Sequence, residues 1–174
     1  LKNNRFHQQI SASYYASPAD PGCAVNLLDA VVLSALEVDT GFNVNVLTGS
    51  DGVIRGAIGG HPDTAWGASL AVIVCPLVRG RIPCVVPKVN TRVTPGKTVD
   101  VLVTDYGVAV NPRRWKLRQR LQDAGIPLRS IEELQQLAQK IVGVPEPIRY
   151  TDKVVGVVTY RDGSVMDLIR QVAD

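Results

Sequence analysis

A short apolar segment that ends in two carboxylates constrains this chain more than any other feature. The run from Ala30 to Leu36 is nearly continuously apolar, and Glu37 and Asp39 follow it. Such a run predicts a strand that is buried on both faces, as in a parallel sheet covered by helices. Groups that bind or react in open α/β sheets collect at the carboxyl ends of the strands. We therefore expect a functional site at Glu37 and Asp39, whose side chains share a face if the strand continues through them.

A carboxylate in that position has a definite chemical use. It can act as a nucleophile toward an acyl group and form an acyl-enzyme or an anhydride. The alternative is structural, because a carboxylate in a loop also caps turns or pairs with a cation such as Arg55. The spacing of Glu37 and Asp39 does not decide between the two interpretations.

A glycine-rich segment follows the carboxylates. Its glycines stand at positions Gly49, Gly52, Gly56, Gly59, Gly60 and Gly67. Glycine permits positive φ and a close approach of backbone N–H groups, so such a loop can form an oxyanion hole or hold a phosphate. An ordinary flexible loop has the same composition, and the spacing does not match the dinucleotide fingerprint GxGxxG. His61 comes directly after Gly59 and Gly60, where it can orient a carboxylate or contact a substrate.

Composition and cysteine usage argue against several other classes of protein. The length of 174 residues suits a single domain over 1–174, and no apolar run is long enough to span a membrane. A net charge of +3 is too small to indicate nucleic-acid binding. The three cysteines form no CxxC pair, which favours a reducing cytoplasm over a disulfide scaffold. With His7 and His61 as the only histidines, we expect no metal site.

The ends of the chain suggest a longer polypeptide. The sequence opens with Leu1, and its only methionine is Met166. We therefore expect that the chain begins inside a larger protein and that a partner half is missing.

The remaining segments indicate alternating strands and helices. The predicted strands are Phe42 to Leu47, Leu70 to Cys75, Pro83 to Val89, Val99 to Thr104 and Val154 to Tyr160. The predicted helices are a short one over Pro62 to Gly67, one from Asn111-Pro112 to Gly125, one from Ser130 to Gly143, and a closing one over Val165 to Val172. Ser130 and Glu133 have the spacing of a capping box. The chain is therefore expected to fold as an α/β domain with an open, mostly parallel sheet covered by helices.

A run of cations marks the first long helix. Its members are Arg113, Arg114, Lys116, Arg118 and Arg120. Such a run is usually a solvated face. The alternatives are that it receives an acidic partner protein or the phosphates of a nucleotide.

Three long stretches of the sequence resemble one family. They are SALEVDTGFNVNVLTGSDGVIRGAIGGHPDTAWGA, then PLVRGRIPCVVPKVNTRVTPGKTVDVLVTDYGVAVNPRR, and GIPLRSIEELQQLAQKIVG with its capping box. Together these stretches cover most of the chain, and they are similar to the citrate lyase alpha-chain family, a relative of the family I CoA-transferases.

The resemblance implies a fold and a reaction. The fold would be of the CoA-transferase type (NagB/RpiA-like), in a two-domain subunit of which this chain is the C-terminal half. The reaction would exchange acetate for citrate on the thioester of an acyl carrier protein. The thiol would belong to a phosphoribosyl-dephospho-CoA prosthetic group on the carrier (gamma) subunit, and no cofactor would bind this chain directly. A separate lyase (beta) subunit would then cleave the citryl thioester, within a cytoplasmic complex that contains several copies of the chain.

The resemblance also implies roles for individual residues. Glu37 matches the glutamate that carries the acyl group, and the segment from Gly59 to Asp63 resembles the GGHxD segment beside the site. The predicted substrate-binding residues are Gly59, Gly60, His61, Asn43 and Arg55, with Arg55 or His61 as a partner for the substrate carboxylates. Glu37 is followed by Val38-Asp39 rather than the Asn-Gly or Ser-Gly of many relatives. Two routes therefore stay open, a covalent glutamyl thioester and direct attack of citrate through a mixed anhydride.

Two other functions fit the same residues. An acyl-CoA hydrolase or a general CoA-transferase would differ only in the acyl acceptor. A non-catalytic module that binds a ligand or the carrier would leave Glu37 buried against Arg55 with no cavity beside it.

Overall fold

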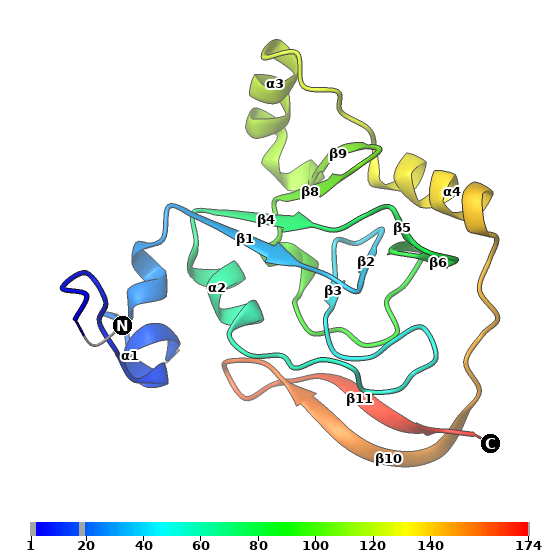
Figure 1. Ribbon diagram of the computed structural model, residues 1–174, viewed down its shortest axis with the longest axis horizontal. Helices are drawn as coiled ribbons and strands as arrows, with labels where there is room; N and C mark the ends of the chain where they lie inside the picture. Colours follow the sequence, from blue (N-terminus) through cyan, green and yellow to red (C-terminus); the bar gives the residue numbers. More distant parts are fainter. Residues whose placement is uncertain (1–2, 18–19, 174) are drawn as a thin grey trace.

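The computed structural model describes residues 3–17 and 20–173 as a mixed α/β arrangement of open sheets (Figure 1). Its largest sheet has the order β1-β4-β8-β9. These strands are β1 (Ala30–Ser34), β4 (Leu70–Val74), β8 (Val101–Thr104) and β9 (Gly107–Val110). The pairs β1–β4 and β4–β8 are parallel, whereas β8 and β9 form an antiparallel pair. The predicted parallel order is therefore confirmed for the first three strands.

The first strand is less buried than its apolar sequence predicts. β1 lies at the edge of the sheet, and its residues alternate between exposed and half-buried. Val32 is 68% exposed. The prediction of a strand buried on both faces is therefore wrong for β1. β8, which lies between β4 and β9, is more buried, since Val101, Leu102 and Thr104 are all buried and Val103 is half-buried.

The carboxylates that follow β1 belong to a second sheet. β2 (Glu37–Asp39) pairs with β3 (Val44–Asn45) antiparallel and with β7 (Val85–Val86) parallel. A further hairpin joins β5 (Val78–Arg79) to β6 (Ile82–Pro83). The predicted strands over 42–47 and 83–89 are thus present mainly as the two-residue strands β3 and β7. The single sheet expected from the sequence is split into several small ones.

The ends of the helices follow local signals in the sequence. α2 (His61–Gly67) has a proline at its start, and the 3₁₀ turn η3 (Pro112–Arg114) leads into α3 (Trp115–Asp123). α4 (Ile131–Val142) begins with the predicted capping box, in which Ser130 and Glu133 exchange hydrogen bonds, and ends at Gly143. The shorter elements are α1 (Ala12–Ala16), η1 (Ala24–Leu27) and η2 (Gly96–Thr98). The three predicted helices before residue 144 are therefore confirmed.

The C-terminal segment is a β-hairpin and not a helix. β10 (Tyr150–Thr159) pairs antiparallel with β11 (Val165–Val172), so the prediction of a closing helix is wrong. A tight turn holds the two strands together, since Tyr160 N–H donates to Ser164 O at 2.8 Å and Gly163 adopts φ +82°. The preceding strand thus offers β11 a pairing partner. The pairing of β10 with β11 places Met166 in a buried cluster with Val158 and Tyr160.

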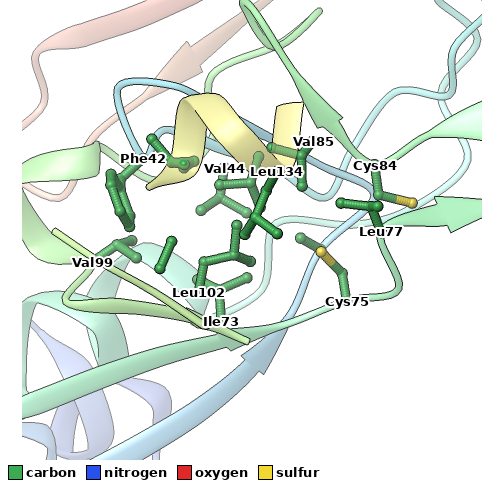
Figure 2. Packing of buried hydrophobic residues seen from close by; sticks show 14 of the residues in the cluster. Phe42, Val44, Ile73, Cys75, Leu77, Cys84, Val85, Val99, Leu102 and Leu134 are labelled. Atoms are coloured by element: carbon green, nitrogen blue, oxygen red, sulfur yellow. The ribbon is translucent and has the colours of Figure 1, made fainter. Parts of the chain in front are cut away.

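The main core lies between the central sheet and α4. Leu134 of α4 points toward Ile73 and Leu102 of the sheet, and Phe42 and Val44 complete the packing from the second sheet (Figure 2). All five side chains are almost fully buried. Because this core joins α4 to both sheets, it fixes the position of the β2–β3 hairpin that carries the two carboxylates. Of the helices described, none is long and apolar enough to cross a membrane.

Candidate active site

Glu37 is a buried carboxylate with three hydrogen bonds. It is the first residue of β2 and is 5% exposed. Its Oε2 accepts from Asn45 Nδ2 at 2.9 Å and from the Asn90 backbone N–H at 3.0 Å, and its Oε1 accepts from Asn90 Nδ2 at 2.9 Å. Both oxygens are therefore held in one orientation.

Asn45 is itself held by its neighbours. It faces Glu37 across the β2–β3 pair and is fully buried. Its Oδ1 accepts from the N–H groups of Leu47 and Thr48, and its Nδ2 also donates to Thr48 O at 2.8 Å. Thr48 is linked in turn to Thr91 through a hydroxyl–hydroxyl contact of 2.8 Å. This network orients the amide so that its N–H groups, and not its oxygen, point toward Glu37.

Burial changes the acidity of Glu37. Removal from water raises the pKa of this carboxyl above 4.5, and the nearby Asp39 adds to the increase. Hydrogen bonds from Asn45 and Asn90 oppose the increase because they stabilise the charged form. A carboxylate that combines a raised pKa with fixed geometry is typical of acyl and proton transfer sites.

Asp39 has a structural role. Its Oδ1 accepts from the N–H groups of Gly41 and Asn43, and it therefore caps the turn between β2 and β3. Asn43 returns hydrogen bonds of 3.1 Å from its Nδ2 to both Asp39 oxygens, and its Oδ1 accepts from Gly96 N–H at 3.0 Å. The interpretation as a turn cap therefore fits Asp39, whereas Glu37 takes no part in the turn.

A cavity of about 170 Å³ lies beside Glu37. Polar residues that line it besides Glu37 are Ser50, Lys88, Asn90, Gln139 and Glu146. Apolar lining comes from Ile82, Val86, Val144 and Ile148 and from several prolines. Glu37 is thus shielded from bulk water and still borders a space that a small substrate group can enter.

Arg55 does not pair with Glu37. Its guanidinium forms a salt bridge with Asp51, four residues earlier, and both side chains are about half exposed. The arrangement expected of a non-catalytic module, with Glu37 buried against Arg55 and no cavity, is therefore absent from the described part of the chain.

His61 links three segments of the fold. Its Nε2 contacts the carbonyl oxygen of Ser34 at 3.0 Å, and its Nδ1 contacts Thr94 Oγ1 at 2.7 Å. A carbonyl can only accept, so the proton lies on Nε2 and the Thr94 hydroxyl donates to Nδ1. Burial lowers the pKa of His61 below 6.5, partly offset by the Ser34 carbonyl, so the ring is neutral at pH 7. Both ring nitrogens already have protein partners.

The predicted site residues thus separate into two groups. Glu37 borders the cavity with Ser50 of the glycine-rich segment, whereas Gly59, Gly60, His61, Asn43 and Arg55 are not among its lining residues. Gly59 adopts φ +53° with open space beside its Cα, directly before α2. The substrate-binding roles of these five residues stay predictions.

Sequence reasoning missed the two asparagines that hold Glu37. A signal for Asn45 exists, because polar Asn43 and Asn45 alternate with apolar residues in the predicted strand over 42–47. A tight turn at Gly41 places that strand opposite Glu37. For Asn90 we find no comparable signal, since it reaches Glu37 from 53 positions further along the chain.

Other groups are poor candidates for chemistry. Burial raises the pKa of the Cys75 thiol to about 12, so this thiol is not a ready nucleophile. Within residues 3–17 and 20–173, no three His, Cys, Asp or Glu side chains gather in a way that could hold a metal ion.

Comparison with known proteins identifies the family. The model of the family "Citrate lyase, alpha subunit (CitF)" matches residues 1–172. The chain is 63% identical to the citrate lyase alpha chain of Klebsiella pneumoniae over 172 residues, and 59% identical to that of Escherichia coli K12 over 174 residues. These alignments cover 99% and 100% of this chain and 34% of each relative. The chain therefore spans about a third of the length of its curated relatives.

A solved structure agrees with this assignment. A Streptococcus mutans protein, described as the alpha subunit of citrate lyase in complex with citrate, superposes with a TM-score of 0.96 at 55% identity. The match covers 99% of this chain and 34% of that one. The family expected from the sequence is thereby confirmed, and the chain belongs to the citrate lyase alpha-subunit family.

Proposed function

We propose that this chain is part of a citrate CoA-transferase subunit. The subunit exchanges acetate for citrate on the thioester of an acyl carrier, giving a citryl thioester and free acetate. Membership of the citrate lyase alpha-subunit family supports the substrate, as does the citrate complex of the Streptococcus mutans relative. In this proposal the fold is of the CoA-transferase (NagB/RpiA-like) type, and the chain is the C-terminal part of a longer, two-domain subunit.

One observation carries the proposal. Glu37 is buried, held by three hydrogen bonds, and borders a cavity. A structural carboxylate satisfied in this way would need no adjoining space. A carboxylate that must meet a substrate needs both a fixed direction and a space into which the reacting carbonyl fits.

Two chemical routes use Glu37. In the first, a Glu37 oxygen attacks the acetyl thioester, the thiolate leaves and then attacks the glutamyl carbonyl, and acetate departs. Citrate subsequently takes the place of acetate by the reverse steps. In the second, a citrate carboxylate attacks the acetyl carbonyl directly. The released thiolate then attacks the citryl carbonyl of the mixed anhydride, acetate leaves, and Glu37 assists as a neighbouring carboxylate.

The oxyanion that forms in either route needs N–H donors. In the described part of the chain, neither Gly59 N–H nor Gly60 N–H donates a hydrogen bond to another protein group. In this proposal these groups stabilise the oxyanion, an effect worth about 3 kcal/mol per donor. Either Arg55 or His61 serves as a partner for the citrate carboxylates, and His61 does so only after it releases Thr94 or Ser34.

The proposal includes partners outside the chain. The thiol belongs to the phosphoribosyl-dephospho-CoA arm of the carrier (gamma) subunit, and a lyase (beta) subunit cleaves the citryl thioester. The rest of the same subunit completes the site, and several copies assemble in a cytoplasmic complex. We expect residues 1–174 alone to be inactive for this reason.

A comparison of acyl acceptors tests the function. The full-length subunit is mixed with an acetyl thioester and with citrate, added acetate or water alone as acceptor. Acetate release should depend on citrate, because the burial of Glu37 keeps bulk water from the reacting carbonyl. Release that is equally fast without citrate would show a hydrolase and contradict the proposal.

Mass spectrometry separates the two routes. The full-length subunit is incubated with acetyl thioester and then trapped with borohydride. A mass change confined to the Glu37 peptide indicates the covalent route. An unmodified peptide with intact citrate-dependent release indicates direct attack.

A further inference from the structure

A second cavity lies at the amino-terminal ends of β4 and β8 in the central sheet. Ser69 and Asp100, which directly precede β4 and β8, line a space of about 340 Å³. Glu37, by contrast, follows the carboxyl end of β1. Because β1, β4 and β8 are parallel, the two cavities are at opposite ends of these strands. The proposed transferase chemistry does not use this second space.

Cations dominate the lining of this second cavity. Lys97, Arg113 and Arg114 all border it, and the carboxylate among its lining residues is Asp100. Asp100 is already engaged, because its Oδ1 lies 3.2 Å from Arg114 Nε and its Oδ2 accepts from Ala71 N–H at 2.9 Å. Within residues 3–17 and 20–173, Lys97 and Arg113 form no salt bridge. The three cations that border the space therefore outnumber the one carboxylate that does so.

Hydrogen bonds to the backbone hold these cations in place. Arg113 Nη1 donates to the carbonyl of Lys97, and Arg114 Nη2 donates to Ser69 O at 2.9 Å. Buried Asn111 stabilises the segment that carries Lys97, because its Nδ2 donates to Gly96 O at 3.0 Å and to Val99 O at 2.9 Å. The guanidinium groups are thus fixed in direction before any ligand arrives.

Lys97 is held by aromatic rings. Its Nζ lies 5.3 Å from the centroid of Trp66 and 5.8 Å from that of Tyr160. Such cation–π contacts orient an ammonium group without neutralising its charge. The two rings therefore orient the Lys97 ammonium group beside the cavity.

The geometry points to a binding site for a phosphate group in this cavity, held by Lys97, Arg113 and Arg114. The planar guanidinium fork matches the geometry of phosphate oxygens, and an ammonium adds a point charge. A space of about 340 Å³ is in the range of small-molecule sites. The further cations Lys116, Arg118 and Arg120 on α3, which projects from the sheet, add a positive field that attracts anions (Figure 1). The ligand class is a phosphate or phosphate ester.

Binding measured on the full-length subunit tests this site. Inorganic phosphate, AMP and adenosine are titrated at low ionic strength, with phosphorus NMR for the first two and calorimetry for all three. Phosphate and AMP should bind, and adenosine should not. Lys97→Gln and Arg113→Gln should each weaken AMP binding about tenfold, as expected for the loss of one charge-assisted hydrogen bond.

Lys116→Gln is the matched control, because Lys116 belongs to the same basic segment but does not line the cavity. It should change the affinity for AMP less than about twofold, since an exposed charge outside the site acts only through a screened field. Circular dichroism and the rate of citrate-dependent acetate release should be unchanged in all three variants, which separates this site from the proposed function.

The phosphate site would be contradicted by failure of the wild-type subunit to bind phosphate or AMP. Binding of adenosine alone would contradict it too. An equal loss of affinity in Lys116→Gln and Arg113→Gln would also overturn it, because attraction would then come from the general charge of the segment.

Discussion

Asn45 and Glu37 lie opposite each other in the antiparallel pair β2–β3, and Asn45 Nδ2 donates a hydrogen bond of 2.9 Å to Glu37 Oε2. One hairpin therefore supplies both the carboxylate and the group that aims it. Asp39 caps the turn of the same hairpin, whereas both oxygens of Glu37 are held by Asn45 and Asn90 beside the cavity.

Replacement of Asn45 by leucine should destabilise the fold and raise the pKa of Glu37 further. The substitution removes one donor to Glu37 and the acceptor for the Leu47 and Thr48 N–H groups. Buried groups left without partners cost about 1–3 kcal/mol each. Urea unfolding gives the loss of stability, and the pH–rate profile of the full-length subunit should shift to higher pH on its acidic side. Gln136→Leu, on the exposed face of α4, should change neither. An unshifted profile in Asn45→Leu would contradict the positioning role.

His61 should make the fold sensitive to mild acid. The unfolded chain takes up a proton on this ring near pH 6.5, whereas burial lowers the pKa of the folded ring. The unfolded state therefore binds more protons below that pH, and the free energy of unfolding falls as the pH drops from about 6.5 toward the lowered pKa.

The His61→Gln variant tests this dependence. It should lose less stability than the wild type between about pH 7.5 and pH 5.5, because an amide does not titrate in that range. The difference in the free energy of unfolding between His61→Gln and the wild type at about pH 7.5 measures separately what the substitution costs in packing. Equal losses for the two proteins between these pH values would show that His61 does not contribute to the acid sensitivity.

Gly96 is needed where η2 meets the β2–β3 turn. A Cβ at this position would lie 1.8 Å from the carbonyl oxygen of Gly41, a contact that requires the backbone to move. Gly96→Ala should therefore destabilise the fold by about 1–3 kcal/mol and slow acyl exchange by displacing the hairpin that carries Glu37. Gly22→Ala is the control, since Gly22 does not adopt a positive φ and a Cβ there would meet only the Asp20 carboxylate, at an ordinary contact distance of 3.4 Å. If both variants lost the same stability and activity, the close contact would not be the cause.

Local signals allowed the helices to be predicted well. The capping box at Ser130 and Glu133, and the proline after Asn111, act within a few residues of the chain and are visible in the sequence. The prediction of a helix over Val165 to Val172 was wrong because the apolar residues Val165, Leu168, Ile169 and Val172 recur at the i, i+3, i+4, i+7 spacing of a helix face. Pairing with β10 decided the outcome, and pairing depends on the turn at Gly163 rather than on the segment itself.

The site was predicted only in part for a similar reason. Glu37 stands out because it ends an apolar run, which is a local feature. Its partner Asn90 and the lining residues Lys88 and Gln139 come from segments far away in the sequence. Contacts of this kind arise from the pairing of β7 with β2 and from the packing of α4 against that sheet, so no short sequence motif predicts them.

The exchange rate of a Glu37→Gln variant tests the role of this carboxylate most directly. Citrate-dependent acetate release from an acetyl thioester is measured in the full-length subunit, with Glu146→Gln as the control because Glu146 lines the same cavity. We expect Glu37→Gln to lose at least about a hundredfold in rate, since an amide cannot act as a carboxylate nucleophile, and Glu146→Gln to stay close to wild type. A Glu37→Gln subunit that retained the full rate would show that Glu37 is not the reacting carboxylate.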